Sequence, residues 1–159
     1  GRFYGYVLNY NATLEIECAF WKAASGQDLS LKMRSRHNEG GDGDNRFGGY
    51  GLSVDKGGWG AKRETFHNEH DQSDSGSLPT KPETGKYFKI EFTVKNEGTG
   101  VRQIGKMDGK QFMDKFDSSP KPYMVNEASY KAQSYFWVRS NIDSGTGEIR
   151  IKRLRILAA

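Results

Sequence analysis

The sequence has little cysteine, little proline and no long hydrophobic run. Its 159 residues include one cysteine and four prolines, so no intrachain disulfide can form. Cys18 alternates in phase with Leu14 and Ile16, which predicts a thiol buried on an apolar strand face rather than an exposed nucleophile. No apolar stretch approaches the roughly 20 residues that a membrane-spanning helix needs, so no membrane span is expected.

Several functional signatures are also missing. The chain contains no phosphate-binding loop, dinucleotide fingerprint, nucleophile elbow or zinc-finger spacing. The formal net charge of +4 fits an anionic polymer as partner, and it also fits many ordinary soluble proteins. A strongly basic stripe and an aromatic-basic RNA-binding motif are absent, so nucleic acid is not an expected partner.

The 20 glycines and frequent turn signals predict short strands in a single domain over residues 1–159. Residues 68–85 are expected to form a long surface loop. The mixed segment 112–133 is expected to contain a short helix over residues 125–133. The expected strands are residues 3–8, 13–21, 29–37, 49–55, 58–66, 87–95, 101–107, 135–141 and 148–157. Many short strands without a long amphipathic helix indicate an all-β antiparallel sandwich or jelly roll.

Three pieces of sequence carry a resemblance. The segment FKIEFTVKN, the MDGK hairpin at residues 107–110, and the final segment EIRIKRLRIL resemble the concanavalin-like jelly rolls. That superfamily includes laminin-G-type modules, carbohydrate-binding modules and jelly-roll polysaccharide lyases. The resemblance implies an antiparallel β-sandwich of the concanavalin-like type. It does not choose between binding and catalysis, because one fold serves both.

Charged and histidine residues concentrate on two predicted strands, in LKMRSRH and WGAKRETFH. The alternation in LKMRSRH places Lys32, Arg34 and Arg36 on one face. Guanidinium groups bind carboxylates and sulfates, and an exposed tryptophan can stack on a sugar ring, so we predict a groove for an acidic polysaccharide. The alternative is a solvated face with cross-strand ion pairs. The predicted ligand-binding residues are Arg34, Arg36, His37, Lys62, Glu64, His67, Trp137 and Arg139.

Two further functions remain open. The pieces MRSRHNE and AKRETFH resemble groove strands of alginate and glucuronan lyases, although the Gln-x-His element of alginate lyases is missing. In a lyase, His67 or Glu64 would be the base that removes the C5 proton of a uronic acid. The third possibility is an interaction domain of a larger surface protein. An Asn11-Ala12-Thr13 sequon and a polysaccharide ligand together lead us to expect an extracellular or cell-surface location.

A glycine-rich acidic segment at residues 38–45 is a weak candidate for calcium. Asp42, Asp44 and Asn45 offer oxygen ligands, but the spacing is not that of an EF-hand, and a flexible loop is the favoured interpretation. His67 and His70 have a His-x-x-His spacing. On a strand these two residues would point to opposite faces, so a zinc site is not expected.

Overall fold

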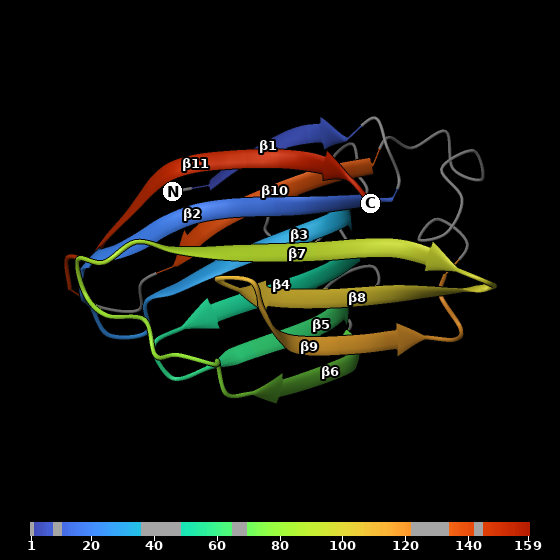
Figure 1. Ribbon diagram of the computed structural model, residues 1–159, viewed down its shortest axis with the longest axis horizontal. Coiled ribbons are helices and arrows are strands. Elements are labelled where there is room, and N and C mark those ends of the chain that lie inside the picture. Colours follow the sequence, from blue (N-terminus) through green and yellow to red (C-terminus); the bar gives the residue numbers. More distant parts are fainter. Residues whose placement is uncertain (1, 8–10, 36–48, 65–69, 122–133, 142–144) are drawn as a thin grey trace.

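The protein is a sandwich of two antiparallel sheets (Figure 1). The computed structural model describes residues 2–7, 11–35, 49–64, 70–121, 134–141 and 145–159. The six-stranded sheet has the order β1 (Arg2–Val7), β10 (Ser134–Asn141), β3 (Asp28–Ser35), β4 (Gly49–Asp55), β5 (Trp59–Glu64) and β6 (His70–Gly76). The five-stranded sheet has the order β11 (Glu148–Ala158), β2 (Ala12–Lys22), β7 (Phe88–Glu97), β8 (Gly100–Met107) and β9 (Lys110–Asp117). This architecture confirms the predicted jelly-roll sandwich.

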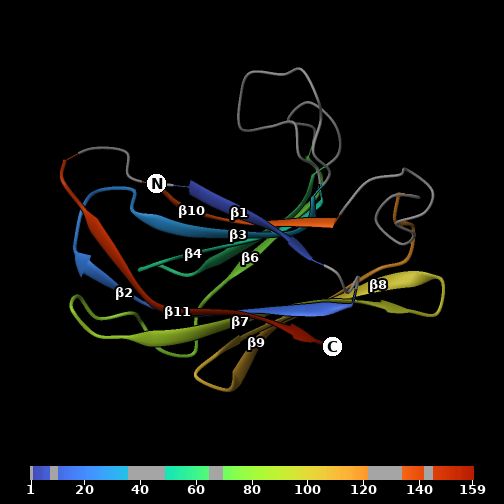
Figure 2. The same cartoon turned by 90° about the horizontal axis from the view of Figure 1, so that it is seen from above.

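The core lies between the two layers (Figure 2). On β2, alternate residues from Ala12 to Phe20 face inward, because successive strand residues point to opposite faces of a sheet. The same alternation governs β7, where Phe88, Ile90, Phe92 and Val94 are buried. Nine strands were expected, and all nine are present: β4 has the predicted ends, and the other strands differ at one or both ends by one or two residues. No helix in the described part of the chain is long and apolar enough to cross a membrane.

Two strands were missed by the sequence analysis. Strand β6 lies within the predicted surface loop 68–85, and most of β9 lies within the mixed segment 112–133. Strand β6 (HDQSDSG) contains no apolar side chain because it is an edge strand whose inward positions make polar contacts, such as Asp74 with Lys115 on β9. A register shift between Gly105 and Lys106 interrupts the pairing of β9 with β8. The expected helix over residues 125–133 lies outside the described residues.

The MDGK segment forms the hairpin between β8 and β9, as predicted. Asp108 and Gly109 have φ values of 48° and 83°, the left-handed region that a two-residue hairpin turn requires at both central positions. The Asp108 carboxylate also accepts a hydrogen bond of 2.9 Å from the backbone N–H of Lys89. The turn residues therefore fix the register of this hairpin and connect it to β7.

A buried polar network joins the two sheets at one end of the sandwich. The Asp117 carboxylate on β9 accepts hydrogen bonds from the Tyr50 hydroxyl (2.7 Å) on β4 and the Arg63 guanidinium (2.8 Å to each oxygen) on β5. The backbone N–H of Ser119 donates to the same carboxylate at 3.0 Å, and Gln72 of β6 approaches it at 3.4 Å. Three strands of one sheet are thus tied to a single carboxylate of the other sheet.

Glycine is required at position 100 by close packing. A Cβ there would lie 2.4 Å from the backbone oxygen of Asp117 and 2.4 Å from the Phe116 ring. We expect Gly100→Ala to lower the free energy of unfolding by about 2 kcal/mol, because the backbone oxygen cannot move away without breaking the β8–β9 pairing. Gly51→Ala is the matched control, since a Cβ there meets nothing closer than 3.8 Å. Urea denaturation measures both, and equal stabilities would contradict the packing argument.

Cys18 is a buried free thiol, as the strand pattern predicted. Burial, assisted by the negative charges of Asp108 and Glu17, raises the pKa of this thiol to about 12. The thiolate is the reactive form, so almost none is present at neutral pH. We expect an aromatic disulfide reagent to modify Cys18 only as fast as the protein unfolds. Rapid modification of the native protein, measured by absorbance without denaturant, would show that the thiol is accessible.

Candidate functional site

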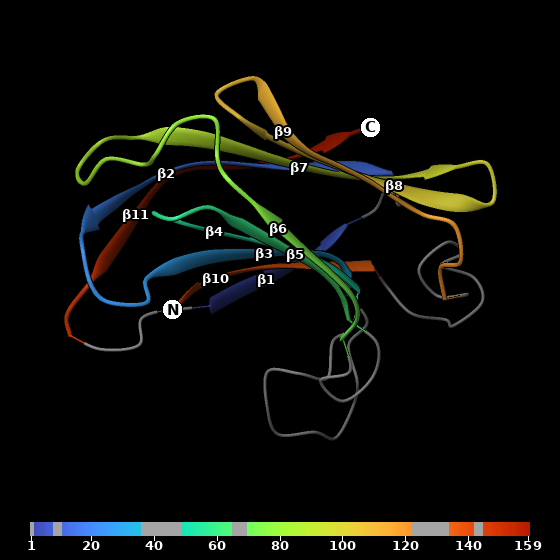
Figure 3. The ribbon, with the colours of Figure 1, turned by 90° about the horizontal axis from the view of Figure 1, so that it is seen from below.

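The outer face of the six-stranded sheet is concave. At one end of the sandwich, β4, β5 and β6 bend away from the five-stranded sheet, and this bend makes the outer face of the six-stranded sheet concave (Figures 2 and 3). A concave sheet face is where a ligand can contact several neighbouring strands at once. The outward positions of these strands are therefore the candidate ligand contacts.

The strand register aligns these outward positions in rows across the sheet. Position 137 on β10 pairs with Lys32 on β3, and position 139 pairs with Ser30. The first complete row is Tyr4, Trp137, Lys32, Gly51, Lys62 and Ser73, and the second is Arg2, Arg139, Ser30, Ser53, Gly60 and Ser75. Residues that are far apart in sequence thus occupy neighbouring backbone positions on one face.

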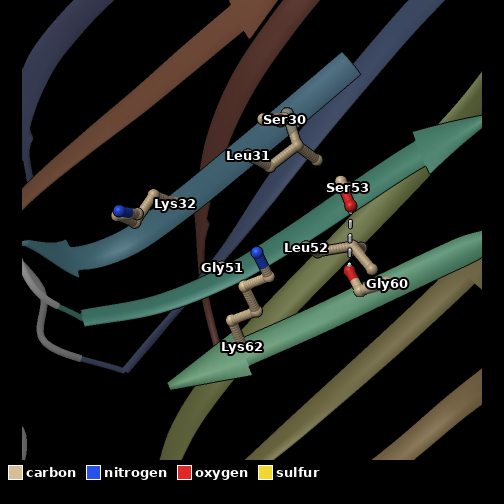
Figure 4. Close-up of a pocket in the computed structure, with 8 residues that line it drawn as sticks. All are labelled: Ser30, Leu31, Lys32, Gly51, Leu52, Ser53, Gly60 and Lys62. Atoms are coloured by element: carbon tan, nitrogen blue, oxygen red, sulfur yellow. Dashed lines mark hydrogen bonds between the residues drawn. The ribbon is translucent and has the colours of Figure 1, made fainter. Parts of the chain in front are cut away.

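A depression of about 100 Å³ lies at the centre of these two rows (Figure 4). Small residues on the central strands create it, because Gly51 and Gly60 have no side chain and the two serines have short ones. The Ser30 hydroxyl donates to Asp28 at 2.9 Å, and the Ser53 hydroxyl donates to the backbone oxygen of Gly60 at 3.3 Å. The lining residues are Ser30, Leu31, Lys32, Gly51, Leu52, Ser53, Gly60 and Lys62.

Two lysines flank the depression, and they differ in exposure. Lys62 is exposed, and its side chain extends from β5 over Gly51 of β4 (Figure 4). Within the described part of the chain, its ammonium makes no hydrogen bond or ion pair, so Lys62 presents a free positive charge to a ligand. Lys32 is only 3% exposed and points away from Lys62 (Figure 4). The accessible charge of this site is therefore that of Lys62.

The structure corrects the assignment of Arg34 to this face. Arg34 is 1% exposed and lies between the sheets, where its guanidinium donates to Asn96 (2.7 Å) and Asn11 (3.1 Å). The reason is a β-bulge: the register shifts between Tyr135 and Trp137, and Arg34 adopts a φ of 56°. Strict alternation along LKMRSRH fails at this bulge, so Arg34 points inward beside Met33.

The other predicted site residues are described to different extents. Lys62 lines the depression, and the backbone positions of Trp137 and Arg139 fall in the two central rows. Glu64 pairs with Gly49 at the end of β5, and its side chain is not described. The predicted residues Arg36, His37, His67, Asp42, Asp44 and Asn45 lie outside the described residues. No group of three or more metal-ligating side chains occurs in the described ranges.

The sequence analysis missed the small residues of the site. Gly51 and Gly60 lie on the outward positions of two adjacent strands, and Ser30 and Ser53 are paired across β3 and β4. Gly51, which stands between the inward-facing Tyr50 and Leu52, was a signal for a shallow surface. It became interpretable only after the strands were paired, because hollowness depends on neighbours from other strands.

Comparison with known proteins identifies the fold class. No protein-family model matches the sequence, and no curated protein is similar to it in sequence. Among solved structures, a legume lectin-like domain from Entamoeba histolytica gives a TM-score of 0.67 at 10% identity, covering 98% of this chain and 76% of that domain. Sheep galectin-11, in complex with glycerol, gives 0.64 at 13% identity, covering 98% and 96%.

An enzyme has the same fold. An alginate lyase from Pseudomonas aeruginosa gives a TM-score of 0.57 at 11% identity, covering 97% of this chain and 68% of the enzyme. The chain therefore has the concanavalin-like jelly-roll fold, which the sequence resemblance had implied. These neighbours include lectins and polysaccharide lyases. The structural similarity establishes the fold. The sequence identities are too low to transfer a function, so the function is argued from this chain's own residues.

Proposed function

We propose that this protein is a carbohydrate-binding domain that recognises an acidic polysaccharide on the concave face of its six-stranded sheet. The observation that carries the proposal is the depression between β3, β4 and β5, with its paired serines and the free ammonium of Lys62. The serine hydroxyls can accept hydrogen bonds from sugar hydroxyls, since each retains lone pairs after its own donation. We also propose an extracellular or cell-surface location, which a polysaccharide ligand would favour.

The charge of Lys62 favours an acidic sugar. An ammonium above a glycine floor can approach a carboxylate or sulfate without obstruction by a neighbouring side chain, and charge-assisted hydrogen bonds are stronger than neutral ones. The position of Trp137, three strands from Lys62 in the same row, is suited to a stacking residue for a sugar bound across β10 and β3. The concave face thus combines a hydroxyl-binding centre with a cation.

Charge reversal at Lys62 tests the proposal. We expect Lys62→Glu to weaken binding of alginate, glucuronan or glycosaminoglycan oligosaccharides at least tenfold, because attraction to the anionic group becomes repulsion. Lys106→Glu is the control, since Lys106 lies on the five-stranded sheet and faces away from the site. A glycan array followed by titration calorimetry, with and without chelator, gives the affinities. Binding should also weaken with added salt, and equal affinities of the two variants would contradict this site.

The same panel distinguishes binding from cleavage. A lyase would release a product with an unsaturated uronic end, which absorbs in the ultraviolet, and His67→Ala would abolish that product while preserving affinity. The assay is run at several pH values and with calcium added. A gain in absorbance with any acidic polymer would favour lyase activity over binding alone as the function of this protein. Binding without a gain in absorbance supports the carbohydrate-binding domain.

A further inference from the structure

A second cavity lies at the end of the six-stranded sheet, beyond the two central rows. It has a volume of about 410 Å³ and is lined by Ala24, Gly26, Gln27, Asp28, Asp55, Lys56 and Gly57. Asp28 and Asp55 are register partners. Asp28 precedes Ser30 by two residues on β3, and Asp55 follows Ser53 by two residues on β4. The cavity is therefore four strand residues from the row of Lys62, a separation of about 13 Å. We call it the rim cavity.

The rim cavity has the opposite charge to the central depression. Asp28 uses one carboxylate oxygen to accept a hydrogen bond from Ser30. Asp55 uses one oxygen for the backbone N–H groups of Gly57 and Gly58, at 2.5 and 2.7 Å. In the described part of the chain, the second oxygen of each carboxylate has no hydrogen-bond donor. Lys56 is the one cation in the lining, and its ammonium donates to Thr84.

Gln27 supplies an independent reason to expect a ligand. It is 6% exposed, and neither its amide nitrogen nor its amide oxygen has a hydrogen-bond partner among the residues that the structure describes. Leaving a buried polar group unpaired costs about 1–3 kcal/mol, so native proteins rarely tolerate it without a functional reason. Gln27 lines the rim cavity, and its two amide atoms are closed off from solvent. A rotation of the side chain toward the cavity would let a bound hydroxyl group both donate to the oxygen and accept from the nitrogen.

We infer that the rim cavity is a second sugar subsite that binds a neutral unit through its hydroxyl groups. Two carboxylate acceptors and a primary amide suit hydroxyl donors, whereas two aspartates that face each other repel a uronate or sulfate. The inference rests on the proposed function, because it extends the same concave face. It narrows the ligand to polysaccharides that contain both acidic and neutral units, with the acidic unit at Lys62 and the neutral unit at the rim cavity.

The test compares oligosaccharides of equal length. Hyaluronan and unsulfated chondroitin alternate glucuronate with a neutral N-acetylhexosamine, whereas every unit of glucuronan is acidic. We expect the wild type to prefer the alternating series at least tenfold by titration calorimetry. The double variant Asp28→Asn, Asp55→Asn should lose this preference, chiefly by binding glucuronan more tightly, because the repulsion is removed. An unchanged ratio in the double variant would overturn the inference.

Gln27→Leu provides a second readout. Because the amide has no partner, we expect this variant to raise the melting temperature and to weaken binding of the alternating series without altering binding of glucuronan. A raised melting temperature with unchanged binding would exclude Gln27 from the subsite. The two aspartates could instead bind a cation, which calorimetric titration of calcium into chelator-treated protein tests. Binding heat in the wild type that is absent in Asp28→Asn would make the cavity a cation site and overturn the inference. Unchanged binding in Lys62→Glu would count against the proposed function, whereas an unchanged preference in the double variant, with binding still dependent on Lys62, would count against the rim cavity alone. The two failures are therefore distinguishable.

Discussion

Replacing Asp117 with alanine is expected to lower the free energy of unfolding by about 3–5 kcal/mol, because the change leaves Arg63 as a buried charge without its counter-ion. The side chains of Asp117 and Arg63 are 0% and 7% exposed, so water cannot replace the lost carboxylate. Tyr50 would also lose the acceptor of its hydroxyl. For a chain of this length, the melting temperature should fall by roughly 10 °C, measured by calorimetry.

Asp114→Ala is the matched control for this prediction. Asp114 lies on the same strand and pairs with Arg102, but it is exposed, and exposed ion pairs contribute about 0–1 kcal/mol. We expect Asp114→Ala to unfold within 1 kcal/mol of the wild type. Similar losses in the two variants would show that burial of the Asp117 network is not what stabilises the fold.

The same network makes stability depend on pH. Burial alone would raise the pKa of Asp117, but hydrogen bonds from Tyr50, Arg63 and the Ser119 backbone outweigh it and lower the pKa below its usual value. A lowered pKa contributes stability that is present above the unfolded-state pKa and lost as the pH falls. The stability difference between wild type and Asp117→Asn should therefore shrink below about pH 4, as measured by urea denaturation.

Replacing Arg34 with alanine is expected to destabilise the protein by about 3 kcal/mol while leaving glycan affinity unchanged. Arg34 is buried between Asn11 and Asn96, and its loss removes charge-assisted hydrogen bonds and leaves two amide oxygens without this donor. The Asn11 oxygen also accepts a hydrogen bond from the backbone N–H of Asn96, at 2.8 Å, so Arg34 and the backbone share one acceptor. Chemical denaturation and calorimetric titration, both at a temperature where the variant is folded, measure the two effects.

Arg34→Lys sharpens the result. A lysine keeps the positive charge but lacks the planar fork that reaches both asparagines, so we expect most of the destabilisation to remain. If Arg34→Ala were as stable as the wild type and bound glycans weakly, the original assignment of Arg34 to the groove would be correct and the bulge argument would fail. This pair of variants therefore separates a structural arginine from a ligand-binding one.

The sequence alone determined the fold class. Alternation in Phe88, Ile90, Phe92 and Val94, with the turn at Asp108 and Gly109, is local information, and local periodicity was sufficient to place nine strands and one hairpin. It was insufficient for β6 and β9, because a polar edge strand and a strand with shifted register do not show clean alternation. Local alternation also led to the expectation of a polar sheet face, and Lys62 does lie on that face.

Only the tertiary structure decided which residues form the site. The bulge in β3 depends on the opposing strand β10, so no pattern within LKMRSRH could show that Arg34 points into the core. The depression arises where the glycines of β4 and β5 lie beside the serines of β3 and β4, which is a property of register between strands. Cross-strand register is a long-range property, and it determines which distant residues become neighbours on the concave face.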